Sequence, residues 1–141
     1  MRVYAETSAV LAALFGESEG ETVAGILDNA EATLTSMLTL AEVERAFCRL
    51  PEVAGPAAAK LAARRPDFLA ASADWIVMPV SSEILFRCGH RFPVEPVRTL
   101  DAVHLGTIER VQQVVPDVVV VSTDRRVRTN AARLGLTVLP G

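Results

Sequence analysis

Four consecutive valines, Val118–Val121, are the stretch that most restricts how this chain can fold. An unbroken run of β-branched residues is typical of a strand that is buried on both faces, as strands are in a parallel sheet. The run is followed by Ser122-Thr-Asp124 and then by an Arg-rich segment with helical character that extends to Leu134. The stretch therefore predicts a parallel sheet covered by helices, with an acid at the exit of one strand.

Strand-like and helix-like segments alternate along the whole chain. Apolar or β-branched runs predict strands at residues 3–5, 32–36, 75–80, 118–122 and 136–139. Apolar residues at helical spacing predict helices at residues 9–14, 19–29, 39–50, 56–65, 66–74, 82–91, 101–113 and 125–134. This order predicts an α/β fold, a three-layer α/β/α sandwich around a mainly parallel sheet of about five strands, in one domain of residues 1–141. Pro79 marks the third strand as an edge strand.

Capping residues and prolines predict several helix ends. Ser8 is placed to cap the first helix through its hydroxyl. Thr39 and Glu42 match the capping box, Ser/Thr-x-x-Glu, at the start of the third helix. Pro51 is expected to end that helix. Gly135 suits the left-handed position that follows the last long helix.

Composition excludes several classes of protein. Half of the residues are hydrophobic and only 5% are aromatic, so the core must consist of Ala, Val and Leu. No apolar stretch approaches the roughly 20 residues of a membrane span, and the first residues do not resemble a signal peptide. We therefore expect a cytoplasmic protein that does not bind membranes. Cys48 and Cys88 are expected to be small core residues rather than a disulfide or a zinc site.

The charged residues argue against a general nucleic-acid coat, because the net charge is −3. Thirteen of the fourteen basic residues are arginine. Local clusters at Arg64-Arg65, at Arg87 with Arg91, and at Arg125-Arg126 with Arg128 can contact phosphate groups. A solvated helix face explains any one of these clusters slightly better.

Four acids stand where a strand gives way to a helix. Glu6 follows the first strand and Asp124 follows the valine-rich strand, whereas Glu42 and Asp101 are expected in the first turns of helices. Singly, each acid has an ordinary explanation as a solvated loop residue or as an acid at a helix N-terminus. In open α/β sheets, however, the carboxyl ends of the strands share one edge, where ligands bind. The four carboxylates are therefore expected to lie close together.

A divalent cation is the expected partner of such a cluster. Like charges in a small volume disfavour one another unless a positive charge lies between them. Hard oxygen ligands suit Mg²⁺ or Mn²⁺, and an ion of this kind orients a water and neutralises charge on a phosphodiester. No Ser/His/Asp triad, GxSxG elbow or Walker loop indicates a different chemistry.

Hydroxyl residues beside the acids are candidates for supporting roles. Thr7 and Ser8 follow the first acid and can hydrogen-bond a carboxylate or a metal-bound water, although simple capping is an equal explanation for Ser8. Ser122 or Thr123 can orient the fourth acid, or both can be ordinary turn residues.

Two further groups flank the predicted site. His104 lies one helical turn from Asp101 on the same helix face. It can steady that carboxylate or contact a ligand, but a partly buried histidine with satisfied hydrogen bonds is the favoured interpretation. Arg125 and Arg126, next to the fourth acid, are the first candidates for phosphate contact.

The acids lie in segments that resemble, in order, the four acidic motifs of the PIN domain. These segments are Val3-Tyr-Ala-Glu-Thr-Ser-Ala-Val10, Leu38-Thr-Leu-Ala-Glu-Val43, Leu100-Asp-Ala-Val-His-Leu105 and Val121-Ser-Thr-Asp-Arg125. The segment Asn130-Ala-Ala-Arg-Leu-Gly-Leu-Thr-Val138 also resembles this family. Length and spacing are similar to those of VapC-type toxins of bacterial toxin–antitoxin pairs over essentially the whole chain. Family members more often have Asp at the place of Glu6, where the extra methylene extends the carboxylate by roughly 1.5 Å.

The resemblance implies a metal-dependent endoribonuclease. Glu6, Glu42, Asp101 and Asp124 would be the catalytic acids and would hold Mg²⁺, with Mn²⁺ as a substitute, while Arg125 and Arg126 would contact RNA. It also implies a homodimer, and a small antitoxin whose C-terminal segment lies across the active-site groove. The apolar helices at residues 9–14 and 23–27 and the region 57–69 would either present a groove to a dimer mate or antitoxin or pack in the core.

Other functions remain open at this point. A nuclease of the same family that serves RNA processing would lack an antitoxin, and a catalytically inactive RNA-binding or protein-binding module would not cleave RNA. A response-regulator-like domain also binds Mg²⁺ at strand ends. That domain needs a lysine near the last strand and an acid pair directly after the first strand, and neither is visible in this sequence.

Overall fold

A sheet of five parallel strands forms the centre of the protein. The computed structural model describes residues 1–141. The strands pair in the order β3-β2-β1-β4-β5, so β1 is central and β3 is an edge strand, as Pro79 predicted. The parallel register places Val3 of β1 between Thr33 of β2 and Val119 of β4. The strands are β1 (Arg2–Ala5), β2 (Ala32–Ser36), β3 (Ile76–Met78), β4 (Val119–Val121) and β5 (Thr137–Leu139).

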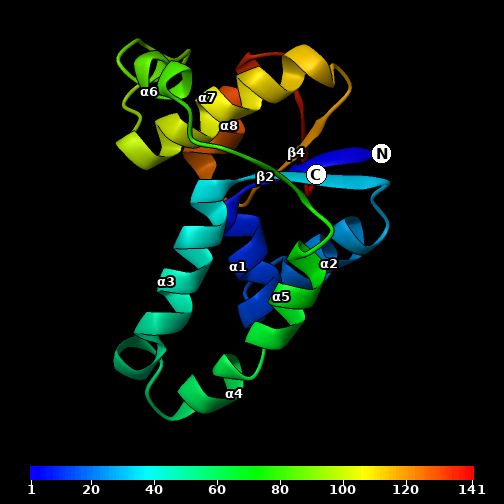
Figure 1. Cartoon of the computed structure of the whole chain (residues 1–141), viewed down its shortest axis with the longest axis vertical. Coiled ribbons are helices and arrows are strands. Elements are labelled where there is room, and N and C mark those ends of the chain that lie inside the picture. The colour runs from blue at the N-terminus through cyan, green and yellow to red at the C-terminus, as the bar shows by residue number, and fades with distance from the viewer.

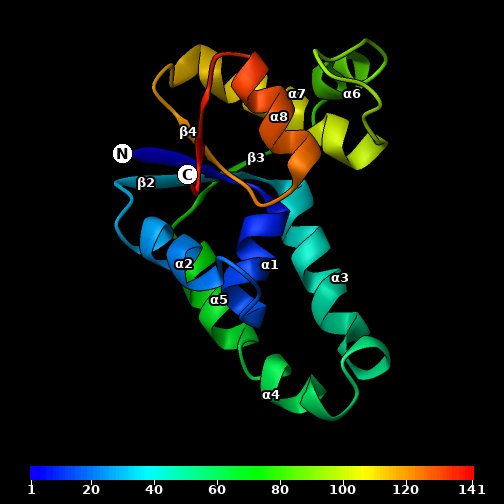
Figure 2. The same ribbon diagram turned by 180° about the vertical axis from the view of Figure 1, so that it is seen from behind.

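Helices cover both faces of the sheet, which confirms the predicted three-layer α/β/α sandwich. In Figures 1 and 2, α6, α7 and α8 lie on one side of the strands, and α1, α2, α3 and α5 lie on the other. The helices are α1 (Thr7–Phe15), α2 (Gly20–Asp28), α3 (Met37–Val53), α4 (Ala58–Ala62), α5 (Arg65–Ser72), α6 (Ser82–Arg87), α7 (Thr99–Val114) and α8 (Arg125–Arg133), with a 3₁₀ turn at Gly55–Ala57.

The central strands are apolar on both faces because each face has a helical layer to contact. Tyr4 packs in a buried cluster with Leu105 and Ile108 of α7, whereas its neighbours Val3 and Ala5 belong to the clusters on the other face. Complete burial of a side chain of this size contributes roughly 1.5–3 kcal/mol to folding. This packing fixes β1, and with it the position of the residue that follows the strand.

The strand order reverses next to β1. The chain runs from β1 through β2 to β3 on one side and then crosses to β4 and β5 on the other. In open α/β sheets, ligands bind outside the carboxyl ends of the strands at such a switch point. Glu6 follows β1 and Asp124 closely follows β4, so both acids flank the switch point.

A helical arm extends from the sheet. α3 leads away from the strands, α4 lies at the tip and α5 returns (Figure 2). The prediction that Pro51 ends α3 is wrong, because the helix continues to Val53 with Pro51 inside it. A proline in the last turn removes only one backbone hydrogen bond, which the end of a helix tolerates better than its middle.

Other helix ends also differ from expectation. α6 ends at Arg87 rather than at residue 91, and the Arg87 guanidinium bonds the backbone carbonyls of His90 and Arg91 and lies over the Phe92 ring. These contacts hold the chain in a loop where the helix was expected. Pro56 lies in a 3₁₀ turn instead of opening a long helix.

Two glycines have identifiable roles. Gly135 adopts φ +86°, which confirms its predicted place after the last long helix. At Gly20, a Cβ atom would lie 2.1 Å from the carbonyl oxygen of Ala12, so only glycine allows α2 to pack this closely on α1.

The cysteines and the helix lengths bear on two further predictions. Cys48 is exposed and Cys88 is partly buried, and both are free thiols. The expectation that Cys48 is a core residue is therefore wrong, since its side chain is exposed on α3. None of the helices combines the length and the apolar character that crossing a membrane requires.

Candidate active site

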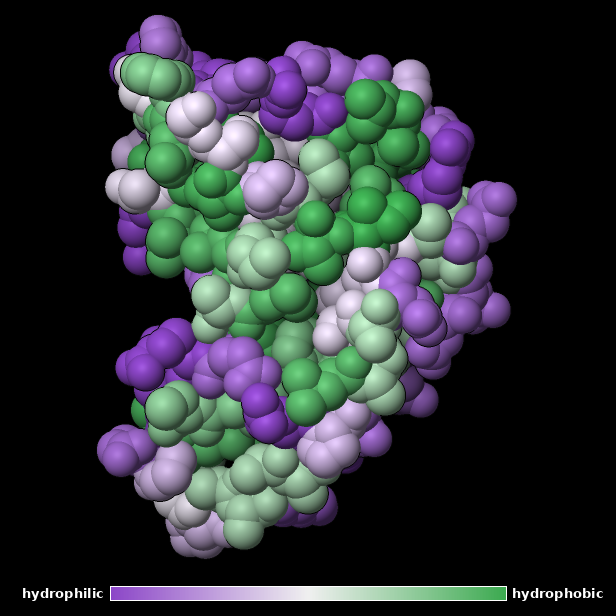
Figure 3. All heavy atoms as spheres, viewed as in Figure 1, coloured by the Kyte–Doolittle hydropathy of each residue, from purple (hydrophilic) through white to green (hydrophobic).

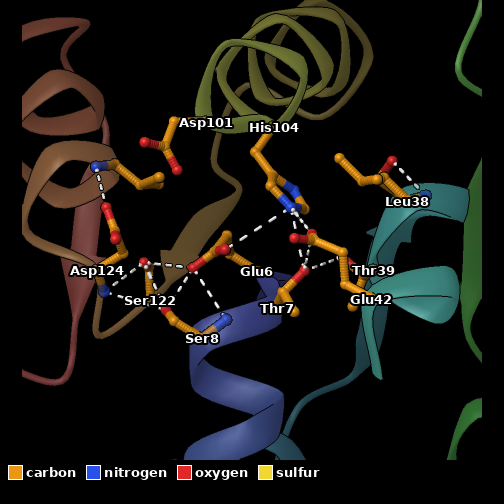
Figure 4. A network of polar contacts seen from close by, with 12 residues as sticks. Glu6, Thr7, Ser8, Leu38, Thr39, Glu42, Asp101, His104, Ser122 and Asp124 are labelled. Carbon is orange, nitrogen blue, oxygen red and sulfur yellow. Dashed lines mark hydrogen bonds and ion pairs between the residues drawn. The ribbon is translucent and has the colours of Figure 1, made fainter. Parts of the chain in front are cut away.

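Glu6 follows β1 directly and forms the N-cap of α1. Its Oε2 accepts hydrogen bonds from the Ser8 backbone N–H (3.2 Å), the Ser8 hydroxyl and the Ser122 hydroxyl (2.8 Å) (Figure 4). The prediction that Ser8 caps α1 is therefore wrong. Because Glu6 occupies the cap position, the Ser8 hydroxyl instead bonds a carboxylate, which was its other predicted role.

Ser8 and Ser122 also fix the turn after β4. The Ser8 Oγ accepts hydrogen bonds from the backbone N–H groups of Thr123 (2.9 Å) and Asp124 (3.0 Å). The Ser122 Oγ accepts another from the Asp124 N–H (3.1 Å). Of the two hydroxyls expected to orient the fourth acid, the Ser122 hydroxyl makes the contact, and Thr123 takes part through its backbone. The serines thus join the start of α1 to the start of α8.

Glu42 lies in the second turn of α3, not in the first. The helix begins at Met37 with Ser36 as its N-cap, and the Ser36 hydroxyl accepts a hydrogen bond from the Leu38 N–H (3.0 Å). β2 therefore passes into α3 without a loop. The predicted capping box of Thr39 and Glu42 is wrong, because both residues lie inside the helix.

Two donors hold the Glu42 carboxylate. Its Oε1 accepts hydrogen bonds from the Thr7 hydroxyl (2.7 Å) and from Nε2 of His104 (2.7 Å). Burial, the largest single influence, raises the pKa of Glu42, but the hydrogen bonds from His104 and Thr7, with electrostatic contributions from His104 and Arg49, leave this pKa below its ordinary value. The surroundings of Glu42 therefore favour its charged form.

His104 on α7 has satisfied hydrogen bonds, as the favoured interpretation predicted, but it is fully rather than partly buried. Its side chain contacts Glu42 through Nε2, and the same nitrogen lies 3.7 Å from Oε1 of Glu6. Its Nδ1 lies 3.0 Å from the Tyr4 hydroxyl. The acid that His104 steadies is thus Glu42 and not Asp101, which was the alternative that the sequence suggested.

Sequence reasoning missed Tyr4. A tyrosine in a strand that is buried on both faces has a hydroxyl that needs a partner, and Tyr4 stands two residues before Glu6. These two facts were sufficient to place it near the site.

Asp101 is the least satisfied of the four acids. It lies in the first turn of α7, as predicted, but its buried Oδ2 has no hydrogen-bond partner, and Nε of Arg98 is 3.9 Å away. Burial first, and then the negative charge of Asp124, raise the pKa of Asp101. Asp124 itself caps α8, because its Oδ1 accepts a hydrogen bond from the Val127 N–H (3.0 Å).

The arginines of α8 divide into two kinds. Arg128 donates to the backbone carbonyls of Ser122 and Pro140, both at 2.7 Å, so its role is to hold α8 against the ends of β4 and β5. Arg125 and Arg126 are exposed and form no ion pair. Both stand in the first turn of a helix, where the dipole disfavours positive charge. The other clusters include structural pairs, Arg65 with Glu44 and Arg87 with Glu109.

A polar hollow of about 390 Å³ lies beside Asp124, and Arg125 and Arg126 line it. Val94 also lines the hollow, and the Asn130 side chain holds it by accepting a hydrogen bond from its N–H (2.9 Å) and donating one to its carbonyl (3.0 Å). The Glu95 carboxylate accepts hydrogen bonds from two backbone N–H groups of the same loop. The hollow is therefore preformed, and neither Asn130 nor Glu95 was identified from the sequence.

The four acids come from four different elements and lie at one edge of the sheet (Figure 4). No three Asp, Glu, His or Cys side chains form a ready metal cluster. The donor set nevertheless fits a hard cation, because all the candidate ligands are oxygens. Asp101 Oδ2 is buried without a donor, and the bonds that hold Glu6 and Glu42 leave Glu6 Oε1 and Glu42 Oε2 without one.

Comparison with solved structures supports the same fold. A toxin–antitoxin complex from Klebsiella pneumoniae matches with a TM-score of 0.61 and 14% identity, covering 99% of this chain and 98% of the other. The structure of VapBC2 from Rickettsia felis bound to a DNA fragment from its promoter matches with a TM-score of 0.56 and 11% identity, with the same coverage.

Sequence comparison identifies the family. Ribonuclease VapC35 of Mycobacterium tuberculosis, from strains CDC 1551 / Oshkosh and ATCC 25618 / H37Rv, is 30% identical over 142 residues, which are 99% of this chain and 97% of the relative. A profile of the PIN domain family matches residues 3–132. This chain therefore belongs to the PIN domain family.

Proposed function

We propose that this protein is a Mg²⁺-dependent endoribonuclease and the toxin of a toxin–antitoxin pair. The observation that carries the proposal is the buried Asp101 Oδ2, which lacks any donor at the edge of the sheet where Glu6, Glu42 and Asp124 also lie (Figure 4). A relative named as a ribonuclease and fold neighbours that are toxin–antitoxin complexes support the same function.

The acids Glu6, Glu42, Asp101 and Asp124 would hold Mg²⁺, or Mn²⁺ in its place. When bound, such an ion activates a water and neutralises charge on the phosphodiester. The remaining residues orient the acids. Ser8 and Ser122 hold Glu6, while Thr7 and His104 hold Glu42.

Arg125 and Arg126 are the proposed contacts for RNA phosphates. They lack ion-pair partners, stand at the helix end where an anion is favoured, and line the polar hollow next to Asp124. An RNA backbone in this hollow would lie beside the acids, with arginines available for charge-assisted hydrogen bonds.

An apolar hollow of about 500 Å³ supports the proposal of an antitoxin partner. It lies between α1, α2 and α5, with Val10, Leu27, Phe68 and Trp75 in its lining. We propose that it receives apolar side chains of the antitoxin. The helices that line this hollow, α1, α2 and α5, include the segments that the sequence indicated either as a groove or as part of the core.

A homodimer is proposed from exposed apolar residues. Phe86 is 77% exposed on α6, next to the exposed Leu85, and Leu100 is half exposed at the start of α7. In Figure 3 the outline is indented between the part that carries α6 and the arm that carries α3, and much of the surface there is hydrophobic. A second copy of the chain would cover such a patch. Size-exclusion chromatography with light scattering, on wild type and Phe86→Glu, tests this assembly.

RNA cleavage is the direct test of function. Purified protein is incubated with a structured RNA in Mg²⁺ or Mn²⁺. EDTA and the Asp101→Asn variant are the negative controls, and Asp74→Asn, at an exposed acid in the turn between α5 and β3, is the matched control. We expect EDTA to abolish cleavage and Asp101→Asn to slow it at least about a hundredfold. Unchanged cleavage in both would disprove the mechanism.

Expression in cells tests the toxin role. We expect growth arrest on expression of the wild type and rescue by co-expression of a small protein encoded next to this gene. Cleavage without arrest, in the absence of such a neighbour, would indicate an RNA-processing nuclease. Absence of cleavage with every RNA tested would indicate an inactive binding module.

A further inference from the structure

His104 lies between two of the acids, Glu6 and Glu42, and the core residue Tyr4. Its side chain is 1% exposed, so it cannot meet a substrate directly. On one side, Nε2 lies 2.7 Å from Oε1 of Glu42 and 3.7 Å from Oε1 of Glu6. On the other side, Nδ1 meets the hydroxyl of Tyr4, which belongs to the central strand.

The short contact with Glu42 determines where one hydrogen lies. A carboxylate oxygen and an unprotonated ring nitrogen are both acceptors, and two acceptors do not approach to 2.7 Å. Nε2 of His104 therefore carries a hydrogen and donates it to Glu42. The nearby Thr7 hydroxyl has a single hydrogen, which also points to Glu42 Oε1 at 2.7 Å.

Tyr4 holds the other ring nitrogen. Its hydroxyl is completely buried and lies 3.0 Å from Nδ1 of His104. A tyrosine hydroxyl can donate or accept a hydrogen bond, so this contact is available to either form of Nδ1. Because Tyr4 belongs to the central strand, the contact fixes the orientation of the imidazole and keeps Nε2 directed at Glu42.

We propose that His104 is a positioning residue whose Nε2–H, fixed by Tyr4, sets the placement of Glu42 relative to Glu6 and thereby the affinity of the acid site for a divalent cation. The inference rests on the proposed function, because it concerns the same acids. Glu6 is attached to the β4 side of the site by the two serines, whereas Glu42 is attached to α3. The His104 ring lies between them, with its Nε2–H donated to Glu42 and the same nitrogen 3.7 Å from Oε1 of Glu6.

Removal of this donor has a definite consequence. Glu42 would keep only the Thr7 hydrogen bond, and it would face Glu6 without an intervening donor. Repulsion between like charges would then drive the two carboxylates apart. Residues that orient metal ligands by hydrogen bonding typically change metal affinity by about 10–100-fold when they are replaced.

Mn²⁺ binding, followed by electron paramagnetic resonance, measures this effect without any need for catalysis. His104→Leu fills the space without a donor, whereas His104→Gln can present an amide N–H near the original Nε2 position. We expect His104→Leu to weaken Mn²⁺ binding by about 10–100-fold, and His104→Gln to regain most of the lost affinity. His90→Gln, at the exposed and only other histidine, is the matched control and should bind like the wild type.

The hydrogen on Nε2 has its own measurement, which also serves if His104→Leu does not fold. In protein labelled with ¹⁵N-histidine, Nε2 of His104 should carry a hydrogen that is protected from exchange with solvent, because the ring is buried. Tyr4→Phe removes the contact at Nδ1 and should weaken Mn²⁺ binding severalfold. A wild-type His104 without a hydrogen on Nε2 would overturn the positioning role.

The outcomes separate this inference from the proposed function. If the wild type binds Mn²⁺ and cleaves RNA, but folded His104→Leu binds Mn²⁺ equally well, the positioning role is wrong and the nuclease proposal stands. If the wild type neither binds Mn²⁺ nor cleaves RNA, the nuclease proposal itself is wrong. Equal losses in His104→Leu and His104→Gln would show that the imidazole acts through packing and would also overturn the positioning role.

Discussion

Glu42 and Asp101 lie at the same edge of the sheet, and the fold treats them in opposite ways. Glu42 receives two hydrogen bonds on one oxygen, and its pKa is lowered in spite of burial. Asp101 has a buried oxygen without any donor, and burial and the charge of Asp124 raise its pKa. The protein alone therefore satisfies the Glu42 carboxylate, which defines the Glu42 side of the site, whereas the Asp101 carboxylate on the other side lacks a positively charged partner.

This contrast indicates which side of the site depends on a ligand. The Glu42 side is built from Thr7, His104 and Tyr4, and these groups hold each other in the core. On the Asp101 side, only the exposed Arg98, at 3.9 Å, approaches the carboxylate. A cation would stabilise the Asp101 side, because it would contact the oxygen that lacks a donor and offset the repulsion between Asp101 and Asp124.

The largest expected effect is stabilisation of the fold by a divalent cation. Binding to the native state alone adds about 2.7 kcal/mol at a hundredfold excess over Kd. We expect Mn²⁺ or Mg²⁺ to raise the Tm relative to EDTA, and Asp101→Asn to remove most of this rise. Differential scanning calorimetry measures both, with Ca²⁺ and Na⁺ as ionic controls. A wild-type Tm that is the same in EDTA and in saturating Mn²⁺ would contradict the assignment of the Asp101 side as the dependent one.

The next prediction compares the stability of two variants in the absence of metal, each with a neutral amide in place of an acid. At pH 7 in EDTA, we expect Glu42→Gln to destabilise the protein by about 1 kcal/mol, because hydrogen bonds to a charged acceptor are stronger than those to a neutral one. Asp101→Asn should stabilise it, because a repelled and poorly solvated charge is removed. Urea unfolding measures the change in the free energy of unfolding for each variant. If this change has the same sign in both variants, the proposed contrast between the Glu42 side and the Asp101 side is wrong.

The pH dependence of these differences follows from the pKa shifts. Glu42 has a folded-state pKa below its ordinary 4.5, so its stabilising contribution is present above pH 4.5 and is lost as the pH falls through the folded-state pKa. Asp101 has a folded-state pKa above its ordinary 3.8, so stability is lost as the pH rises from 3.8 through the folded-state pKa. Both variants should therefore approach the stability of the wild type as the pH falls below these values.

Some features of this contrast could be read from the sequence. The valine run and the alternation of elements predicted the parallel sheet, and parallel strands place the residues that follow them at one edge. The acids Glu6 and Asp124 were located because they stand beside strand ends, where position along the chain determines position in space. Asp101 was placed correctly in a first turn for a similar reason.

The hydrogen bonds that distinguish the acids could not be predicted. They join residues far apart in the chain, such as Ser122 with Glu6 and His104 with Glu42, and they depend on which oxygen each side chain turns toward its neighbour. The helix start at Ser36 also depended on tertiary structure. Two hydroxyl residues, Ser36 and Thr39, were suitable caps, and only the packing of β2 in the sheet decides between them.

A smaller effect is expected where RNA would meet the Asp101 side. Arg126 contributes positive charge near Asp101 and lines the polar hollow. Arg126→Ala should weaken binding of a single-stranded RNA in EDTA by roughly fivefold, about 1 kcal/mol, and should reduce the salt dependence by about one phosphate contact. Arg133→Ala, at the other end of the same helix, is the control and should bind normally. Equal losses in both variants would indicate attraction by net charge rather than a defined contact.

The smallest effect tests the acid that joins the two sides. Glu6 is held by Ser8 and Ser122 through Oε2, and its Oε1 faces His104 at 3.7 Å. Glu6→Asp should still cap α1, since aspartate is a good N-cap, but a side chain shorter by roughly 1.5 Å cannot keep all of these contacts. We expect a loss of less than about 1 kcal/mol, mainly from the Ser122 hydroxyl that is left without its acceptor.

A double-mutant cycle isolates that contact. Ser122→Ala should cost more stability in the wild type than in Glu6→Asp, because in Glu6→Asp the bond from Ser122 to the carboxylate is already broken and only the bond from the Asp124 N–H is lost. Ser8→Ala should cost stability in both backgrounds, since the Ser8 hydroxyl also accepts the N–H groups of Thr123 and Asp124. Additive effects of Glu6→Asp and Ser122→Ala would mean that the longer side chain is not needed to reach the β4 turn. The glutamate would then owe its place to the His104 side of the site alone.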